Sequence, residues 1–188
     1  TVRCDGYTVT RSVAGELVGS SRMHGTVSLS EGPDVGCSFV GGSMSADIRL
    51  DFLSLEDEID ATLTATNFQV TDELTAGTCA ELITINGTLG LDDRADGDSV
   101  RQTFTDFQIG LQEDVGATLM TMDGRASSKC VGEVVFDTLE PISVPTDAEC
   151  PTAGLIQVTI VRTAETATVR FNPDGSVEFD LGVDGTVD

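Results

Sequence analysis

Aspartates near the end of the chain have the residue type and spacing of a calcium loop. FDLGVDGTVD places Asp180, Asp184 and Asp188 around Gly185, which suits the sharp turn of such a loop. With Gly185 at the sixth loop position, the third position is Gly182, which has no side-chain oxygen, and the sequence stops before the twelfth-position carboxylate. We therefore interpret this segment as a last strand, with weak calcium binding as the alternative.

A second acidic segment, LDDRADGD, is a further candidate for calcium. Asp96 and Asp98 stand two residues apart, which is the spacing of alternate ligands in a calcium loop. The ordinary interpretation of the segment is a solvated acidic turn, so we expect no cofactor, with calcium as the alternative.

Residues that could catalyse a reaction are few. His24, the one histidine, follows Ser20 and Ser21, but the stretch reads as the start of a strand, where a base four residues away does not meet a nucleophile. No G-x-S-x-G motif is present. The carboxylates of SLEDEID could in principle hydrolyse a glycoside, but the chain has no Trp and one Tyr to stack on a sugar. We expect a protein that is not an enzyme.

The five cysteines are widely spaced and include no C-x-x-C pair, which argues against zinc ribbons and thioredoxin-like motifs. Cysteines spread through an acidic β-rich chain favour disulfides in an oxidising compartment. From their positions we predict a Cys37–Cys79 and a Cys130–Cys150 disulfide, although other pairings remain open. Cys4 is then left free or forms an intermolecular link.

The charge balance excludes several partners. The chain has 32 Asp and Glu against 10 Lys and Arg, a net charge of −22, and phosphate binding requires clustered bases. We therefore expect no nucleic-acid partner. No run of residues approaches the ~18 apolar residues of a membrane span, so we expect no transmembrane segment. Thr1 in place of Met fits a removed export signal or an excised fragment, and we predict a secreted protein, extracellular or in the cell envelope.

Alternating apolar and polar residues predict an all-β fold. SADIRLDF puts Ala46, Ile48, Leu50 and Phe52 on one face, and the same period of two recurs in ELITINGTLGL, TFTDFQIGL, GLIQVTIV and SVEFDLGV. Short Gly-, Asp- and Pro-rich turns separate these runs. We predict about ten to twelve antiparallel strands, in a β-sandwich or an open barrel or meander.

Domain organisation follows from the turns. We predict a single β domain over 1–188, with a sub-boundary near 140–154 that would set off a C-terminal β-hairpin unit, 155–188. NPDG is predicted to be a hairpin turn, because Pro173 presets φ at its second position and Gly175 adopts the left-handed conformation. We find no clean internal repeat.

Residues 132–188 resemble the C-terminal part of secreted bacterial lipoproteins of uncharacterised function. GEVVFDTLEPI, then CPTAGLIQVTI, then FNPDGSVEFDLGVDGTVD carry the resemblance. It implies an all-β fold and an envelope or extracellular address, and it implies no activity.

Two functional hypotheses remain. The first is a non-enzymatic structural or interaction module at the cell surface or in the medium, which self-assembles by strand addition into an oligomer or filament, or binds another surface protein. Its candidate donor strands are Tyr7–Val13 and Val177–Val183. The alternative is a ligand-binding sandwich or barrel with weak calcium binding.

Overall fold

The computed structural model describes residues 2–13, 16–37, 41–55, 59–94, 97–148 and 150–182, and for residues 2–13 and 16–18 it describes the backbone only. These residues form eleven strands and no helix, which confirms the predicted all-β class. The strands are β1 (Val2–Val13), β2 (Glu16–Glu31), β3 (Gly42–Ser54), β4 (Ile59–Leu74), β5 (Glu81–Asp93), β6 (Asp98–Asp114), β7 (Ala117–Ser128), β8 (Gly132–Pro145), β9 (Ala153–Ile160), β10 (Glu165–Phe171) and β11 (Val177–Leu181).

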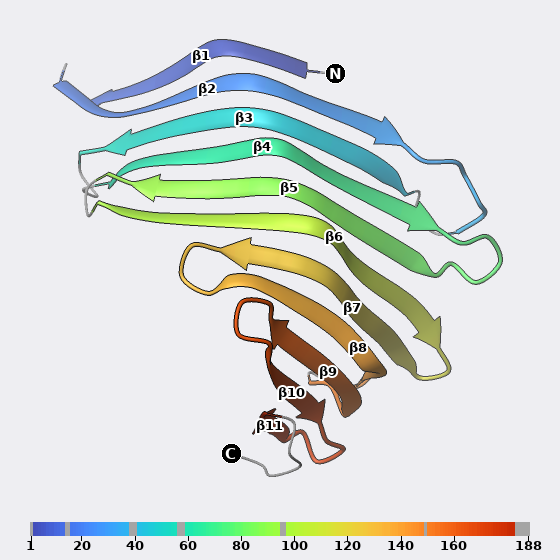
Figure 1. Ribbon diagram of the computed structural model, residues 1–188. Helices are drawn as coiled ribbons and strands as arrows, with labels where there is room; N and C mark the ends of the chain where they lie inside the picture. Colours follow the sequence, from blue (N-terminus) through green and yellow to red (C-terminus); the bar gives the residue numbers. More distant parts are fainter. Residues whose placement is uncertain are drawn as a thin grey trace.

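All the strands lie in one antiparallel sheet whose spatial order is the chain order (Figure 1). Short connections explain the meander, because two strands joined by a tight turn become antiparallel neighbours. Of the predicted arrangements, the open meander is the one that forms, and the described residues contain no second sheet for a sandwich. Successive loops therefore alternate between the two ends of the sheet.

The C-terminal strands continue the same sheet. β8 runs through the EPISVP segment and pairs with β9, although its register shifts twice there. The NPDG turn between β10 and β11 is confirmed: Gly175 has a φ of 81° and its N–H donates to the Asn172 carbonyl at 3.0 Å. Asn172 in turn donates its N–H to the Ser176 carbonyl at 3.0 Å, which closes the hairpin.

A row of β-bulges crosses the middle of the sheet. Asp47 of β3 accepts a hydrogen bond from the Asn67 N–H of β4 at 2.6 Å, and Asn86 of β5 accepts one from the Asp106 N–H of β6 at 2.8 Å. Asn67 and Asp106 both have positive φ, 47° and 46°, and both lie at register shifts. Such bulges bend strands and increase their twist, and the long strands are visibly bowed (Figure 1).

The bulge row reveals a two-strand repeat that the sequence analysis missed. The segments TNFQV at 66–70 and TDFQI at 105–109 occupy equivalent places, 39 residues apart, in β4 and β6. The strands that pair with them, β5 and β7, carry Asn86-Gly87 and Asp123-Gly124 at the bulge. A Cβ on Gly87 would lie 2.3 Å from the Asn67 carbonyl oxygen, so glycine is required at this approach.

The register places apolar and polar side chains on opposite faces of the sheet. Partners across the ladder share a face, and Leu50, Leu63 and Leu91 follow one another across β3, β4 and β5. The apolar face continues in this way from β2 to β11. Its most buried part is a stripe of three alanines, two isoleucines and one phenylalanine. The residues of this stripe are Ala46, Ala65, Phe107, Ala126, Ile142 and Ile156.

Aromatic rings fill the centre of the apolar face. Phe107 packs edge to face against Phe104, with ring centroids 5.7 Å apart, and against Phe136 at 5.5 Å. A sheet with one layer can bury a side chain only against its neighbours on the same face. The small alanines of the stripe leave space on this face for the rings. The sheet thus has one face covered with apolar side chains, and the described residues provide no second layer that packs on it.

Candidate interaction surface

The apolar face of the sheet exposes large side chains that a globular domain of this size would bury. Phe52 of β3 is 40% exposed, Leu91 of β5 46% and Val100 of β6 62%. The exposed apolar residues continue on β11, where Val177, Phe179 and Leu181 alternate with acidic residues. Large contiguous apolar surfaces are typical of interaction sites in soluble proteins.

Among the described residues of β2 to β11, the carboxylates on the apolar face stand at the two ends of the strands. The register assigns these residues to the apolar face: Glu31, Asp72, Glu81, Glu113, Asp93, Asp98 and Glu165. The first four lie at the end that carries the β2–β3 and β4–β5 loops, and the other three lie at the opposite end. The described residues of β2 to β11 place no Arg or Lys on this face. We call the two groups the carboxylate rims.

Two carboxyls of one rim are coupled. Burial, together with the charge and the hydrogen bond of Asp72, raises the pKa of Glu81. One oxygen of Asp72, Oδ1, is buried without a hydrogen-bond partner. Asp72 also lines an open recess of about 430 Å³ with Glu31, Glu73 and backbone of the β2–β3 loop. This recess lies at the sheet end.

The polar face carries an ion-pair network centred on Thr62, which is only 2% exposed. Its hydroxyl donates to Asp51 Oδ1 at 2.6 Å and accepts from Arg94 Nη1 at 2.9 Å. Arg49 donates to Asp51 at 2.9 Å, and Arg94 Nε donates to Asp60 at 2.7 Å. The hydrogen bonds from Arg49 and Thr62 lower the pKa of Asp51 to about 2. The ion pairs of Arg49 and Arg94 thus lie on the polar face.

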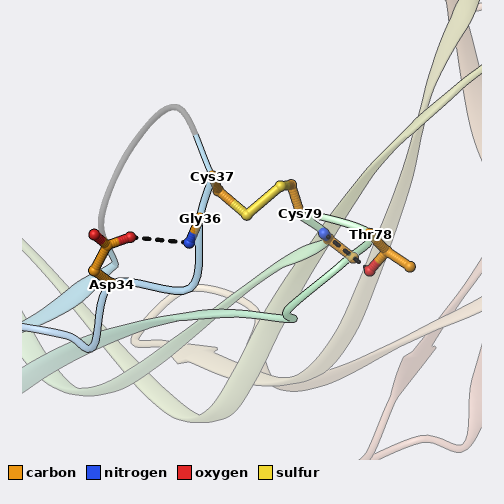
Figure 2. Close-up of a disulfide and its surroundings, with 6 residues drawn as sticks. Asp34, Gly36, Cys37, Thr78 and Cys79 are labelled. Carbon is orange, nitrogen blue, oxygen red and sulfur yellow. Dashed lines mark hydrogen bonds between the residues drawn. A yellow bond between two sulfur atoms is a disulfide. The ribbon is translucent and has the colours of Figure 1, made fainter.

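A disulfide joins two loops at one end of the sheet. Cys37 of the β2–β3 loop bonds to Cys79 of the β4–β5 loop, with Cα atoms 5.7 Å apart, so the predicted Cys37–Cys79 pair forms. Figure 2 shows the surrounding turns: the Gly36 N–H donates to Asp34 Oδ1 at 2.9 Å beside one half-cystine. The disulfide therefore links the loop before β3 to the loop after β4, next to the start of β3 and the end of β4.

The predicted Cys130–Cys150 disulfide is wrong, since both residues are exposed free cysteines. Cys130 lies in the turn before β8 and Cys150 in the loop after it, so the whole strand separates them. A strand of 14 residues spans roughly 45 Å, whereas bonded cysteines need Cα atoms within about 7 Å. Cys4 lies in β1, opposite Gly25 of β2.

The predicted calcium ligands are only partly described. Asp96, Asp184 and Asp188 lie outside the described residues. Asp98 begins β6, and Asp180 lies within β11 at the far side of the sheet. Among the residues that the structure describes, no group of three His, Cys, Asp or Glu side chains is placed to hold a metal ion. Calcium binding therefore stays a prediction.

The residues considered for catalysis are not brought together in the described part of the chain. His24 lies in β2 opposite Arg49, and Ser20 lies on the same face four residues away. That separation is about 13 Å along an extended strand, too far for a hydrogen bond. The described residues also contain no helix long and apolar enough to span a membrane.

Comparisons with protein-family models, with curated proteins and with solved structures gave no match to this chain.

Proposed function

We propose that this chain is a non-enzymatic structural and interaction module of the cell surface or the medium, and that it assembles by pairing its outermost strands. One observation carries the proposal: the sheet stays open. In the described residues β1 pairs with β2 alone and β11 with β10 alone. Edge strands present unpaired N–H and C=O groups to other chains. β1 contains the predicted donor Tyr7–Val13, and β11 contains residues 177–181 of the other, whose last residue, Val183, lies outside the described residues.

The number of strands favours one mode of pairing. In an antiparallel meander of eleven strands, β1 and β11 run in the same direction. Head-to-tail addition of copies would therefore create a parallel junction, whereas two β1 strands related by a two-fold axis form an antiparallel one. Antiparallel pairs are somewhat more stable, and β1 offers 12 residues against five in β11. We expect β1 to pair with β1 of a second copy.

The proposed location rests on two independent features. The Cys37–Cys79 disulfide favours an oxidising compartment, because cytosolic thiols are kept reduced. The resemblance of residues 132–188 to secreted lipoproteins supports the same address.

Proline substitutions at two successive positions of β1 test the edge pairing. Successive residues of an edge strand point their N–H groups alternately toward the sheet and outward. One of the two variants Thr8→Pro and Val9→Pro therefore removes an outward N–H, and the other breaks a hydrogen bond to β2. We expect the first kind to lower the sedimentation mass while the melting temperature stays near wild type. Equal masses for the wild type and both variants would contradict edge pairing.

A further inference from the structure

The whole chain exposes more surface than a folded monomer of its mass. Its accessible area is 11729 Å², whereas a single chain of 19.7 kDa exposes about 8,600 Å². The excess, about 3,000 Å², has a definite place, because the apolar face of the sheet has no covering layer in the described residues. Exposure of this face to water is unfavourable, and its free-energy cost is proportional to the apolar area of the face.

We propose that a second copy of this chain covers the apolar face, so that two sheets pack face to face. Eleven strands at about 4.8 Å spacing and about 40 Å length give a face of about 2,000 Å². Two such faces bury up to about 4,000 Å² in total, which is in the range of obligate homodimers. The area lost per copy also accounts for most of the excess exposure.

The arrangement of side chains on this face matches the anatomy of a protein interface. The centre is aromatic and aliphatic, around Phe104, Phe107 and Phe136, and the carboxylate rims stand at the strand ends. Sheets that pack face to face lie about 10 Å apart with strands within about 30° of each other, so apolar centres meet and the rims stay wet. A sheet with continuous apolar patterning on one side is half of such a sandwich.

Charge disfavours a lipid surface as the occupant. Helices and sheets that lie on membranes place Lys and Arg beside their apolar surface, where they meet anionic headgroups. Here the bases of β2 to β10, such as Arg22, Arg49 and Arg101, fall on the polar face, and carboxylates flank the apolar one. The net charge of −22 adds to the repulsion from an anionic bilayer.

Repulsion between the rims of two copies is small by comparison. Two carboxylates 10 Å apart in water repel by about 0.4 kcal/mol, and the Debye length of about 8 Å at physiological salt reduces this further. Full burial of a Phe or Leu contributes roughly 1.5–3 kcal/mol, so the side chains of this face that are about half exposed contribute about half of this before the cost of association. The dimer should therefore tighten as salt rises, in contrast to an assembly held by ion pairs.

This inference goes beyond edge pairing, because it uses a different surface of the molecule. Two leucines of β5 make a matched pair: Leu91 lies on the apolar face and is 46% exposed, and Leu82 lies on the polar face and is 37% exposed. We expect Leu91→Glu to halve the mass measured by sedimentation equilibrium and to raise binding of an apolar dye. Leu82→Glu adds the same charge and should leave both readouts at the wild-type value.

A photo-crosslinking amino acid at position 52, on the apolar face, supplies the second readout. We expect a crosslinked species of twice 19.7 kDa from this position and none from position 82. The crosslink should persist in the proline variants of β1, so failure of edge pairing and failure of face packing are separable. A wild-type chain that sediments at 19.7 kDa, or that floats with neutral phosphatidylcholine vesicles in place of dimerising, would overturn the proposal.

Discussion

Removal of the Cys37–Cys79 disulfide should destabilise the sheet by an amount that follows from its place in the chain. The two cysteines are 42 residues apart and enclose β3 and β4. Loop-closure entropy for such a ring predicts a loss of about 4 kcal/mol in the free energy of unfolding. For a chain of this length that corresponds to a fall in melting temperature of roughly 10 °C.

The double variant Cys37→Ser/Cys79→Ser tests this, with urea unfolding and thermal melting followed by circular dichroism. The control is Cys130→Ser/Cys150→Ser, which removes two exposed thiols and should change stability by less than about 0.5 kcal/mol. The reasoning fails if the first pair costs less than about 1 kcal/mol, or if the control costs as much as the first pair.

The remaining predictions concern single side chains. Thr62→Val should cost about 1–3 kcal/mol in urea unfolding and raise the pKa of Asp51 above about 2, seen by NMR titration, because the carboxylate loses a donor. Gly87→Ala should cost at least about 3 kcal/mol, since its Cβ would overlap backbone, whereas Gly116→Ala, with open space around it, should cost about 1 kcal/mol. Glu81→Gln should stabilise the fold at pH 7, because folding raises the pKa of this acid and so favours its protonated form. The gain in the free energy of unfolding should vanish as the pH falls below 4.5, where the acid is protonated in both states. A gain that persists there would contradict a raised pKa of Glu81.

Much of the fold follows from residue alternation. Ala46, Ile48, Leu50 and Phe52 were predicted to share a face, and the unbroken register of β3 with β2 confirms it. The period of two is a local property, so it can be read from any strand without knowledge of its neighbours. For the same reason the strand count and the NPDG turn could be predicted.

The pairing of cysteines depends on which end of the sheet each loop occupies, and this requires the topology. Cys130 and Cys150 are close in sequence, but one strand between them carries them to opposite ends. Cys37 and Cys79 have two strands between them, which returns the chain to the same end. Once a meander is assumed, counting strands between cysteines separates the two cases.

The bulge row could not be predicted as a row, because each bulge is defined by the register of two neighbouring strands. Its sequence signal was present: TNFQV and TDFQI differ in two residues, and both place an Asn or Asp before Phe. Five residues recurring once are too short a match to stand out without the positive φ of Asn67 and Asp106 beside it. The apolar face of the sheet was likewise not predicted as one continuous surface, although the apolar side of several of its strands was predicted separately.

Pairing of each strand with its chain neighbours gives the sheet a mechanical character. β1 and β11 lie ten strand spacings apart, about 5 nm, and a pull between these two strands acts along the hydrogen bonds, perpendicular to the strands. Load then falls on one ladder at a time, so the outer strands should peel away singly, in steps. The Cys37–Cys79 bond would arrest this peeling at β2 from one side and at β5 from the other. Under tension, β3 and β4 would be the last folded element, held inside a covalent ring that force cannot open.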